Sequence, residues 1–219
     1  ADVLQSDSMP ATDELQIRDA KQVRQRRLQI LRSPLAIRIP MLDPERFLAS
    51  LAPLFSPLFS VPGMVLWLVV VGWAIFLATG HWSELTENVS DRVLAMDNRR
   101  LLWLTFPVVK ALHELGHGFA VKRWGGEVHE MGIMLLVLMP VPYVDASAAS
   151  AFREKHQRMI VGAAGILVEM FIAALALLVC LEVESGLVRA CAFNIMLIAG
   201  LSTVLFNGNP LLRFDGYYI

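Results

Sequence analysis

The sequence predicts an all-α polytopic membrane protein of about four transmembrane helices, with a short β or re-entrant segment beside its one strongly polar helix. Hydrophobic residues make up 56% of the 219-residue chain, and the mean hydropathy is +0.55. The apolar residues are gathered in runs about as long as the hydrocarbon core of a bilayer is thick. The net charge of −1 gives no electrostatic case for a nucleic-acid partner.

The N-terminal part of the chain is polar. Residues 1–42 favour a solvated helix or tail at a membrane surface, with a basic cluster at Arg24, Arg26, Arg27 and Arg32. Asp43-Pro44 is typical of a helix start. A short amphipathic helix over residues 45–51 should follow and lie in the interface. We therefore expect residues 1–60 to form an N-terminal cytoplasmic or interfacial region.

Three long apolar runs predict transmembrane helices. Residues 61–80 carry no charge, and neither do residues 190–206. Residues 159–181 carry one charge, Glu169. Residues 83–100 are polar with mixed charge, which indicates a loop or surface helix. Residues 61–100 are accordingly interpreted as the first transmembrane helix and an outer loop.

The distribution of basic residues predicts the orientation. With the N-terminus inside, fourteen of the 19 Lys and Arg residues lie in inner segments and four in outer loops. Such an excess of basic residues is typical of the cytoplasmic side. Only two cysteines are present, which excludes a disulfide framework. Cys180 and Cys191 lie near the ends of adjacent spans, and we expect two buried thiols, with a bridge as the alternative.

A fourth membrane helix, residues 101–124, is predicted to carry a polar stripe. At helical spacing Lys110, His113, Glu114 and His117 lie on one side of an otherwise apolar segment. Lipid does not tolerate such a stripe, so it should face the protein interior or a wet cavity. Two histidines four residues apart can share a metal ion, and the adjacent glutamate can act as a general base on a metal-activated water.

A catalytic zinc site needs a third protein ligand. His81 falls on the wrong side of the membrane, and His129 and His156 lie in polar segments typical of surface histidines. Asp215 is better placed, because it follows the last span on the same side as His117. By spacing alone Asp215 fits either a ligand or an ordinary Asp-Gly turn.

A second apolar segment lies between the motif and the next span. Residues 131–144 carry no charge, but they are too few to span a bilayer and are interrupted by Pro140 and Pro142. We expect a strand or re-entrant segment beside the site, with a packed apolar loop as the alternative.

In these features the chain resembles the site-2 protease family of intramembrane zinc metalloproteases, over residues 101–219. That family carries His-Glu-x-x-His on a membrane helix, which here is residues 113–117. On a later helix the family carries Asn-x-x-Pro, followed by an apolar residue and Asp-Gly. In this chain the matching residues are 207–216 (NGNPLLRFDG). A β-type segment lies between them, which suits residues 131–144.

One departure concerns residues 165–169, where the family often has Gly-Pro and this chain has no proline and ends in Glu169. The family's substrate-handling roles on this helix are therefore not carried over. Glu169 is expected to pair with Lys110 or Arg213, or to line a path for water.

The resemblance implies a zinc metalloendopeptidase that hydrolyses membrane-embedded or membrane-associated polypeptides. His113, His117 and Asp215 would bind Zn²⁺, and Glu114 would be the catalytic base. Asn207 would bind the substrate or its oxyanion, with a helix cap as the alternative.

The same resemblance implies the setting of the enzyme. Residues 101–219 would form a metalloprotease membrane core that continues beyond the last residue of this sequence. The expected location is the cytoplasmic membrane of a bacterium, with the N-terminus inside. The partners would be the lipid bilayer, a membrane protein or peptide substrate, and proteins of export or peptide maturation.

Two other classes fit part of the pattern. A non-proteolytic metal-binding membrane protein, such as a transporter or an inactive protease homologue that binds partners, would need the ligands but not the base Glu114. A membrane di-iron oxygenase would need many more histidines than the five present, and carboxylate-rich helices. We keep the metal-binding membrane protein as the alternative to the protease.

Overall fold

The computed structural model describes residues 36–87, 89–136, 139–209 and 215. The elements are, in chain order, β1 (Ala36–Leu42), α2 (Glu45–Phe55), the 3-10 turn η1 (Ser56–Phe59), α3 (Val61–Gly80), α4 (Trp82–Thr86), α5 (Val89–Leu94), α6 (Met96–Arg123), β2 (Met131–Leu136), β3 (Met139–Val144), the 3-10 turn η2 (Ser147–Ala151), α7 (Lys155–Glu182), α8 (Leu187–Ser202) and the π-helical turn η3 (Thr203–Asn207). The basic cluster before residue 33, Pro210, Arg213, Phe214 and Gly216 lie outside the described residues.

The chain divides into two compact units. One comprises Ala1–Ile39 and Met134–Pro140, and the other comprises Pro40–Ile133 and Val141–Ile219. All the described helices and all the candidate site residues belong to the second unit. The helices and the site are therefore described within that unit alone.

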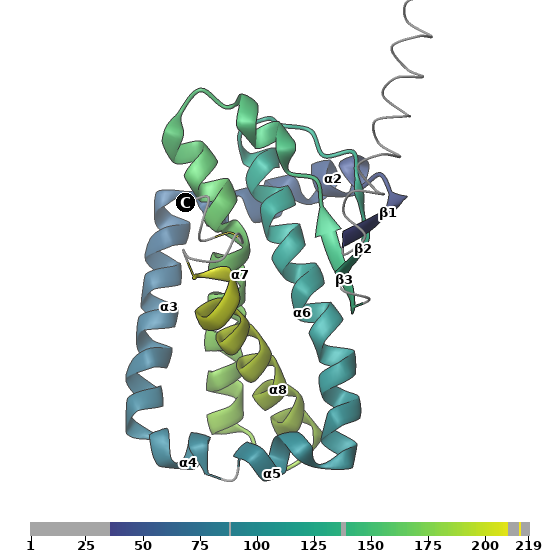
Figure 1. Ribbon diagram of the computed structural model, residues 1–219. Helices are drawn as coiled ribbons and strands as arrows, with labels where there is room; N and C mark the ends of the chain where they lie inside the picture. The colour runs from purple at the N-terminus through teal and green to yellow at the C-terminus, as the bar shows by residue number, and fades with distance from the viewer. Residues whose placement is uncertain (1–35, 88, 137–138, 210–214, 216–219) are drawn as a thin grey trace, which may run out of the picture. The chain divides into compact units, whose positions relative to one another are not determined.

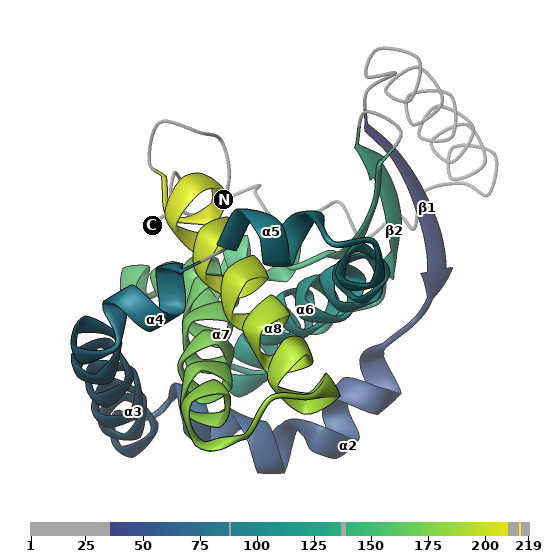
Figure 2. The same ribbon diagram turned by 90° about the horizontal axis from the view of Figure 1, so that it is seen from below.

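Four long helices of the second unit form a bundle (Figures 1 and 2). Helix α7 contacts α3, α6 and α8, and α6 also contacts α8. The indole N–H of Trp67 on α3 donates to the backbone carbonyl of Leu167 on α7 (2.8 Å). The side-chain amide of Asn194 on α8 donates to Asn98 on α6 (2.8 Å). Polar pairs of this kind hold helices together where the surroundings are apolar.

Three helices are long and apolar enough to cross a membrane: Val61–Gly80, Lys155–Glu182 and Leu187–Asn207. They correspond to three of the four predicted spans, and α3 has the predicted bounds. Helix α6 has 28 residues, which is long enough, but its polar residues make it less apolar than these three. Its place in the membrane stays a prediction.

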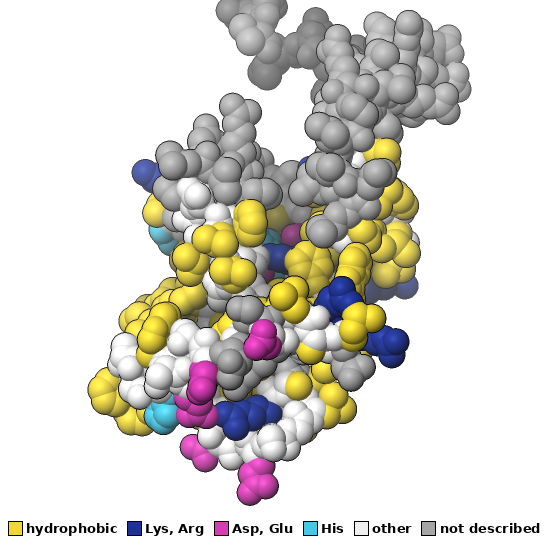
Figure 3. All heavy atoms as spheres, turned by 60° about the horizontal axis from the view of Figure 1, so that its bottom comes forward, with side chains coloured by type: hydrophobic (Ala, Val, Ile, Leu, Met, Phe, Trp, Pro, Cys, Tyr) yellow, Lys and Arg dark blue, Asp and Glu magenta, His cyan; other side chains and the backbone are white. Residues whose placement is uncertain are grey.

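The surface of α3 is apolar over almost its whole length. Of its side chains only Val71 and Ala74 are buried, and large side chains such as Val61 (79% exposed) and Phe76 (64% exposed) face outward. An apolar patch of this extent is unusual on a protein surrounded by water and fits contact with lipid. Charged side chains instead gather at the end of the bundle where α4 and α5 lie (Figure 3), among them the pair Glu84–Arg189 (2.5 Å).

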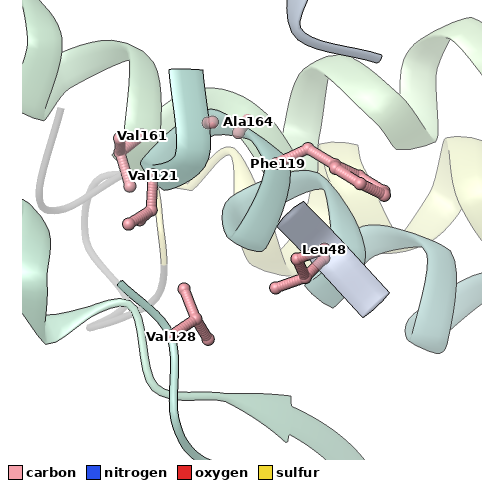
Figure 4. Packing of buried hydrophobic residues seen from close by; sticks show 7 residues of the cluster. Leu48, Phe119, Val121, Val128, Val161 and Ala164 are labelled. Carbon is pink, nitrogen blue, oxygen red and sulfur yellow. The ribbon is translucent and has the colours of Figure 1, made fainter. Parts of the chain in front are cut away.

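Helix α2 packs on the C-terminal half of α6. Leu48 of α2 is fully buried, in a cluster with Phe119, Ala120, Val121, Val128, Val161 and Ala164 (Figure 4). Gly118 permits this contact, because a Cβ there would lie 3.0 Å from Leu48 Cδ1. The predicted amphipathic helix at 45–51 is thus confirmed and is four residues longer.

Polar contacts fix the start of α2. The carboxyl of Asp43 accepts the backbone N–H of Glu45 (2.9 Å), and the helix starts one residue later than Asp43-Pro44 predicts, with Pro44 as its N-cap. The carboxylate of Glu45 accepts the Lys122 ammonium (2.5 Å) and the backbone N–H of Val128 (2.9 Å). Glu45 therefore joins α2 to the end of α6 and to the segment that leads into β2.

The strands form a three-stranded sheet with the order β1-β2-β3. Strands β2 and β3 confirm the strand predicted within residues 131–144. The prediction for residues 36–42 was wrong: they form β1 and not a solvated helix or tail. Their partner strand lies about ninety residues further along the chain, so no local signal indicates it. Pro40 is tolerated because β1 lies at the edge of the sheet.

The connection between α3 and α6 contains two short helices, α4 and α5, which agrees with the surface helix that was one of the two possibilities for residues 83–100. Helix α6 then begins at Met96, five residues before the predicted start, and Pro107 lies inside the helix. Cys180 and Cys191 are free thiols, as expected.

Helix α6 approaches α7 closely at Gly116. A Cβ at this position would lie 2.8 Å from Val168 Cγ2 and 3.2 Å from the carbonyl oxygen of Ala164. We expect Gly116→Ala to destabilise the protein by about 1–3 kcal/mol, because the two helices must separate. The matched control is Gly72→Ala on α3, where a Cβ meets nothing within 4 Å. Thermal unfolding in detergent measures both, and equal midpoints for the two variants would contradict this packing.

The contact between Glu45 and Lys122 predicts a dependence on pH. The Lys122 ammonium, with the Val128 N–H, holds the pKa of the Glu45 carboxyl below its ordinary value of 4.5. A lowered pKa in the folded state stabilises the protein above pH 4.5, and this contribution disappears as the pH falls through the folded-state pKa. We expect Glu45→Gln to unfold at a lower temperature than the wild type at pH 7, with the difference closing in acid. A difference that is independent of pH would exclude the charge interaction.

Candidate metal centre

His113 and His117 lie one turn apart on α6 and are both buried, at 5% and 8% exposure. Their Nε2 atoms are 3.2 Å apart. Both rings lie against Gly165 of α7, where a Cβ would overlap the His113 ring and lie 2.6 Å from His117 Nε2. The missing side chain of Gly165 is what makes room for the two imidazoles between α6 and α7.

The structure places Asp215 beside both histidines. Its Oδ2 atom lies 2.9 Å from His113 Nε2 and 3.4 Å from His117 Nε2. These three residues form a group that could hold a metal ion. The structure leaves His81, His129 and His156 exposed and outside this group.

The partners of the other ring nitrogens define the state of the two histidines. His117 Nδ1 lies 2.7 Å from the backbone carbonyl oxygen of Val161, which can only accept a hydrogen bond. His113 Nδ1 lies 3.2 Å from a carboxylate oxygen of Glu169. Each neutral ring therefore carries its proton on Nδ1, which leaves a lone pair on each Nε2.

Three acceptor atoms consequently face one another: His113 Nε2, His117 Nε2 and Asp215 Oδ2. This carboxylate oxygen is buried without a hydrogen-bond partner among the described residues. Buried acceptors in such proximity are stabilised by a positive charge among them, which a bound metal ion or a proton on one ring can supply. In a tetrahedral zinc site with bonds of about 2.0–2.1 Å, neighbouring ligand atoms are about 3.3 Å apart. The separations of 2.9, 3.2 and 3.4 Å fit a single ion of that size.

Glu114 lies next to the group but is not part of it. Its Oε2 atom accepts the backbone N–H of Val144, the last residue of β3 (3.0 Å). The carboxylate also interacts electrostatically with both histidines and with Asp215. Helix α6 thus supplies two candidate ligands and an adjacent carboxylate, and β3 accounts for the position of that carboxylate.

Glu169 is the buried centre of a polar network that connects three segments. It is fully buried on α7. Its Oε1 atom accepts Lys110 Nζ (2.7 Å) and His113 Nδ1 (3.2 Å), both from α6. Its Oε2 atom accepts the Thr203 hydroxyl (2.7 Å) and the Asn207 amide (2.8 Å), both from η3. The predicted pairing with Lys110 is present, and the contact with His113 was not predicted.

Asn207 lies at the end of η3, and the structure directs its amide to Glu169. Its contact with substrate stays a prediction. The turn is wide because the N–H of Gly208 donates to the carbonyl of Thr203 five residues earlier (2.7 Å). This spacing brings Thr203 and Asn207 to the same carboxylate oxygen, and such π-helical turns are frequent at functional sites.

A large cavity of about 430 Å³ lies elsewhere in the second unit. Apolar side chains of α2, η1, α3, α6 and α7 line it, among them Phe47, Trp67, Leu115 and Phe171. It contains no titratable group and no ligand atom for a metal, so it is not the place of acid-base or metal chemistry.

Comparisons of the chain with models of protein families, with curated proteins and with solved structures find no match. The fold and the site define a helical protein with three helices able to cross a membrane and a His-His-Asp group, with both histidines buried, that could hold a metal ion. A more particular function has to be argued from the geometry of this group.

The metal site predicts the metal content of variants. We expect His113→Ala, His117→Ala and Asp215→Asn to reduce the bound metal from one ion per chain to background, because each removes one of three ligands. His129→Ala is the matched control, since that histidine is exposed and lies outside the group. Elemental analysis of the detergent-purified proteins measures the metal. Undiminished metal in the three ligand variants would contradict the site.

Proposed function

We propose that the chain is an intramembrane zinc metalloprotease of the site-2 protease type, which hydrolyses peptide bonds of membrane-embedded or membrane-associated polypeptides. The observation that carries this proposal is that His113 Nε2, His117 Nε2 and Asp215 Oδ2 lie within 3.4 Å of one another in the helix bundle. Glu114 adds a base that a site for binding alone does not need.

The ligand set supports the choice of zinc. Two imidazoles and one carboxylate are used by catalytic zinc sites, which leave a fourth position for water or substrate. Iron(II) oxygenases use the same three ligand types. Glu114 favours a zinc hydrolase over an iron(II) oxygenase, since metal-assisted hydrolysis needs a proton acceptor beside the metal. Elemental analysis separates the two metals directly.

The residues of the site suit peptide hydrolysis. When bound, zinc supplies Lewis-acid chemistry that makes a water molecule more acidic and polarises the substrate carbonyl. Because Glu114 Oε2 accepts the Val144 N–H, Oε1 is the atom that takes the proton of the attacking water. The same oxygen then delivers that proton to the leaving amine nitrogen. Val144 keeps the carboxylate oriented through both steps.

The outer side of β3 lies beside Glu114. The N–H of Asp145 donates toward β2, to the carbonyl of Glu130 (2.9 Å). Successive N–H groups of a strand point to opposite sides, so the N–H of Val144 points away from β2, and there it meets Glu114. A substrate segment that unwinds beside residues 141–144 would lie next to the base. It would contact carbonyl groups of this edge, because Pro142 has no N–H and the N–H of Val144 is bonded to Glu114.

The polar network supports a membrane position for α6. Lys110 and His113 point into the bundle and pair with α7, which leaves apolar side chains such as Trp103 (72% exposed) and Leu104 (69% exposed) on the outside. A helix with this division can pass through lipid. We therefore extend the proposal to four membrane helices in a bacterial cytoplasmic membrane with the N-terminus inside.

The decisive experiment compares Glu114→Gln with the wild type on a panel of single-span peptides in detergent or lipid. We expect cleavage to fall at least about 100-fold while zinc stays bound, since the amide cannot accept the proton. Glu127→Gln is the matched control, because it makes the same change on an exposed side chain. Equal cleavage by wild type and Glu114→Gln would remove this base from the mechanism. Bound metal without any cleavage by the wild type would favour the non-proteolytic metal-binding protein.

A further inference from the structure

The carboxylate of Glu169 carries a function that burial alone does not explain. A charged side chain in an apolar helix bundle is costly and persists only when it is paired. Here Lys110 neutralises the charge, and three further donors occupy the remaining positions of the carboxylate. One salt bridge would satisfy the charge, so the other donors indicate that the carboxylate orients them.

The first group that Glu169 orients is His113. A carboxylate can only accept, so the contact of Oε1 with His113 Nδ1 (3.2 Å) places the ring proton on Nδ1 and the lone pair on Nε2. His117 obtains the same tautomer from the backbone carbonyl of Val161. Among the described residues the Asn207 amide also lies near His113 Nδ1, at 3.5 Å, but the carboxylate of Glu169 is nearer and can accept its proton.

The second element that Glu169 orients is the turn η3. Thr203 and Asn207 both donate to Oε2. Asn207 ends the turn, and the chain continues from there to Asp215, eight residues later. Glu169 therefore fixes the point from which the chain runs to the third ligand.

We propose that Glu169 is a positioning residue for the metal centre, which holds His113 with its Nε2 lone pair toward the ion and fixes the turn that precedes Asp215. This inference rests on the proposed metal site. Carboxylates that accept the second nitrogen of a metal-binding histidine increase the affinity for the metal. Glu169 acts through its neighbours and is not itself a ligand, because its oxygens are occupied by other donors.

The test compares metal binding by Glu169→Gln and by Glu182→Gln in the full chain in detergent. Both variants make the same change on α7, but Glu182 is exposed at the end of the helix. We expect Glu169→Gln to weaken Zn²⁺ binding about 10–100-fold in competition with a chelator. We also expect it to change the visible absorption of the Co²⁺-loaded protein, because His113 and Asp215 are no longer held. Glu182→Gln should match the wild type in both measurements.

A second variant covers the case in which Glu169→Gln does not fold. The double variant Lys110→Met with Glu169→Leu replaces the ion pair by apolar groups, a change that is often neutral or stabilising. It still leaves His113 Nδ1 without its acceptor, so we expect the same loss of zinc affinity in a folded protein. Wild-type affinity and an unchanged Co²⁺ spectrum in the folded double variant, or in folded Glu169→Gln, would overturn the proposal.

The outcomes separate this inference from the proposed function. A wild-type protein that binds no metal would overturn both. A wild-type protein that binds Zn²⁺, with Glu169→Gln binding it equally, would overturn only the positioning role. A wild-type protein that binds Zn²⁺ tightly and cleaves nothing, with the expected loss in Glu169→Gln, would support the positioning role and contradict the protease.

Discussion

The constraint on which the site depends is that polar groups inside an apolar helix bundle must pair with one another. Lipid provides no hydrogen bonds, so every buried donor and acceptor needs a partner from a neighbouring helix. Glu169 meets this requirement for α6, α7 and η3 at once, through Lys110, His113, Thr203 and Asn207. The arrangement of the helices and the arrangement of the site are therefore set by the same contacts.

Close approach of backbones is the second condition for this network. Gly116 on α6 and Gly165 on α7 lie at the contact between the two helices, and a Cβ at either would meet atoms of the other helix. Because the imidazoles occupy the space left at Gly165, the ligands are buried among helices and not on a loop. Rings locked by packing and by hydrogen bonds on Nδ1 are preorganised for an ion.

Much of the fold was predictable because its signals are local. The lengths of the apolar runs identify three helices, and the bounds of α3 agree residue for residue. The start of α2 was predictable to within one residue from Asp43-Pro44, since Asp43 accepts the N–H of Glu45. Strand β1 was not predictable, because residues 36–42 become a strand only by pairing with β2, far along the chain. The early start of α6 was missed because Arg99 and Arg100 suggested the end of a loop.

The candidate site also has a part that the sequence predicts and a part that only the structure shows. The spacing of His113, Glu114 and His117 places them on one side of a helix by helical geometry alone. Glu169 is the single acidic residue of an apolar span, which predicts that its charge is paired. Neither pattern states which atoms meet. The contact of Asp215 with both histidines joins residues about a hundred positions apart, and the contact of Glu169 with His113 depends on the register of α7 against α6.

The sequence by itself determined which segments are apolar enough to cross a membrane and which residues stand one turn apart, because both properties follow from local composition and helical period. Only the tertiary structure decided that two imidazoles and a distant carboxylate share one buried point, and that the carboxylate of Glu169 orients one of the rings. Those contacts join residues up to about a hundred positions apart, and their formation depends on the packing of whole helices.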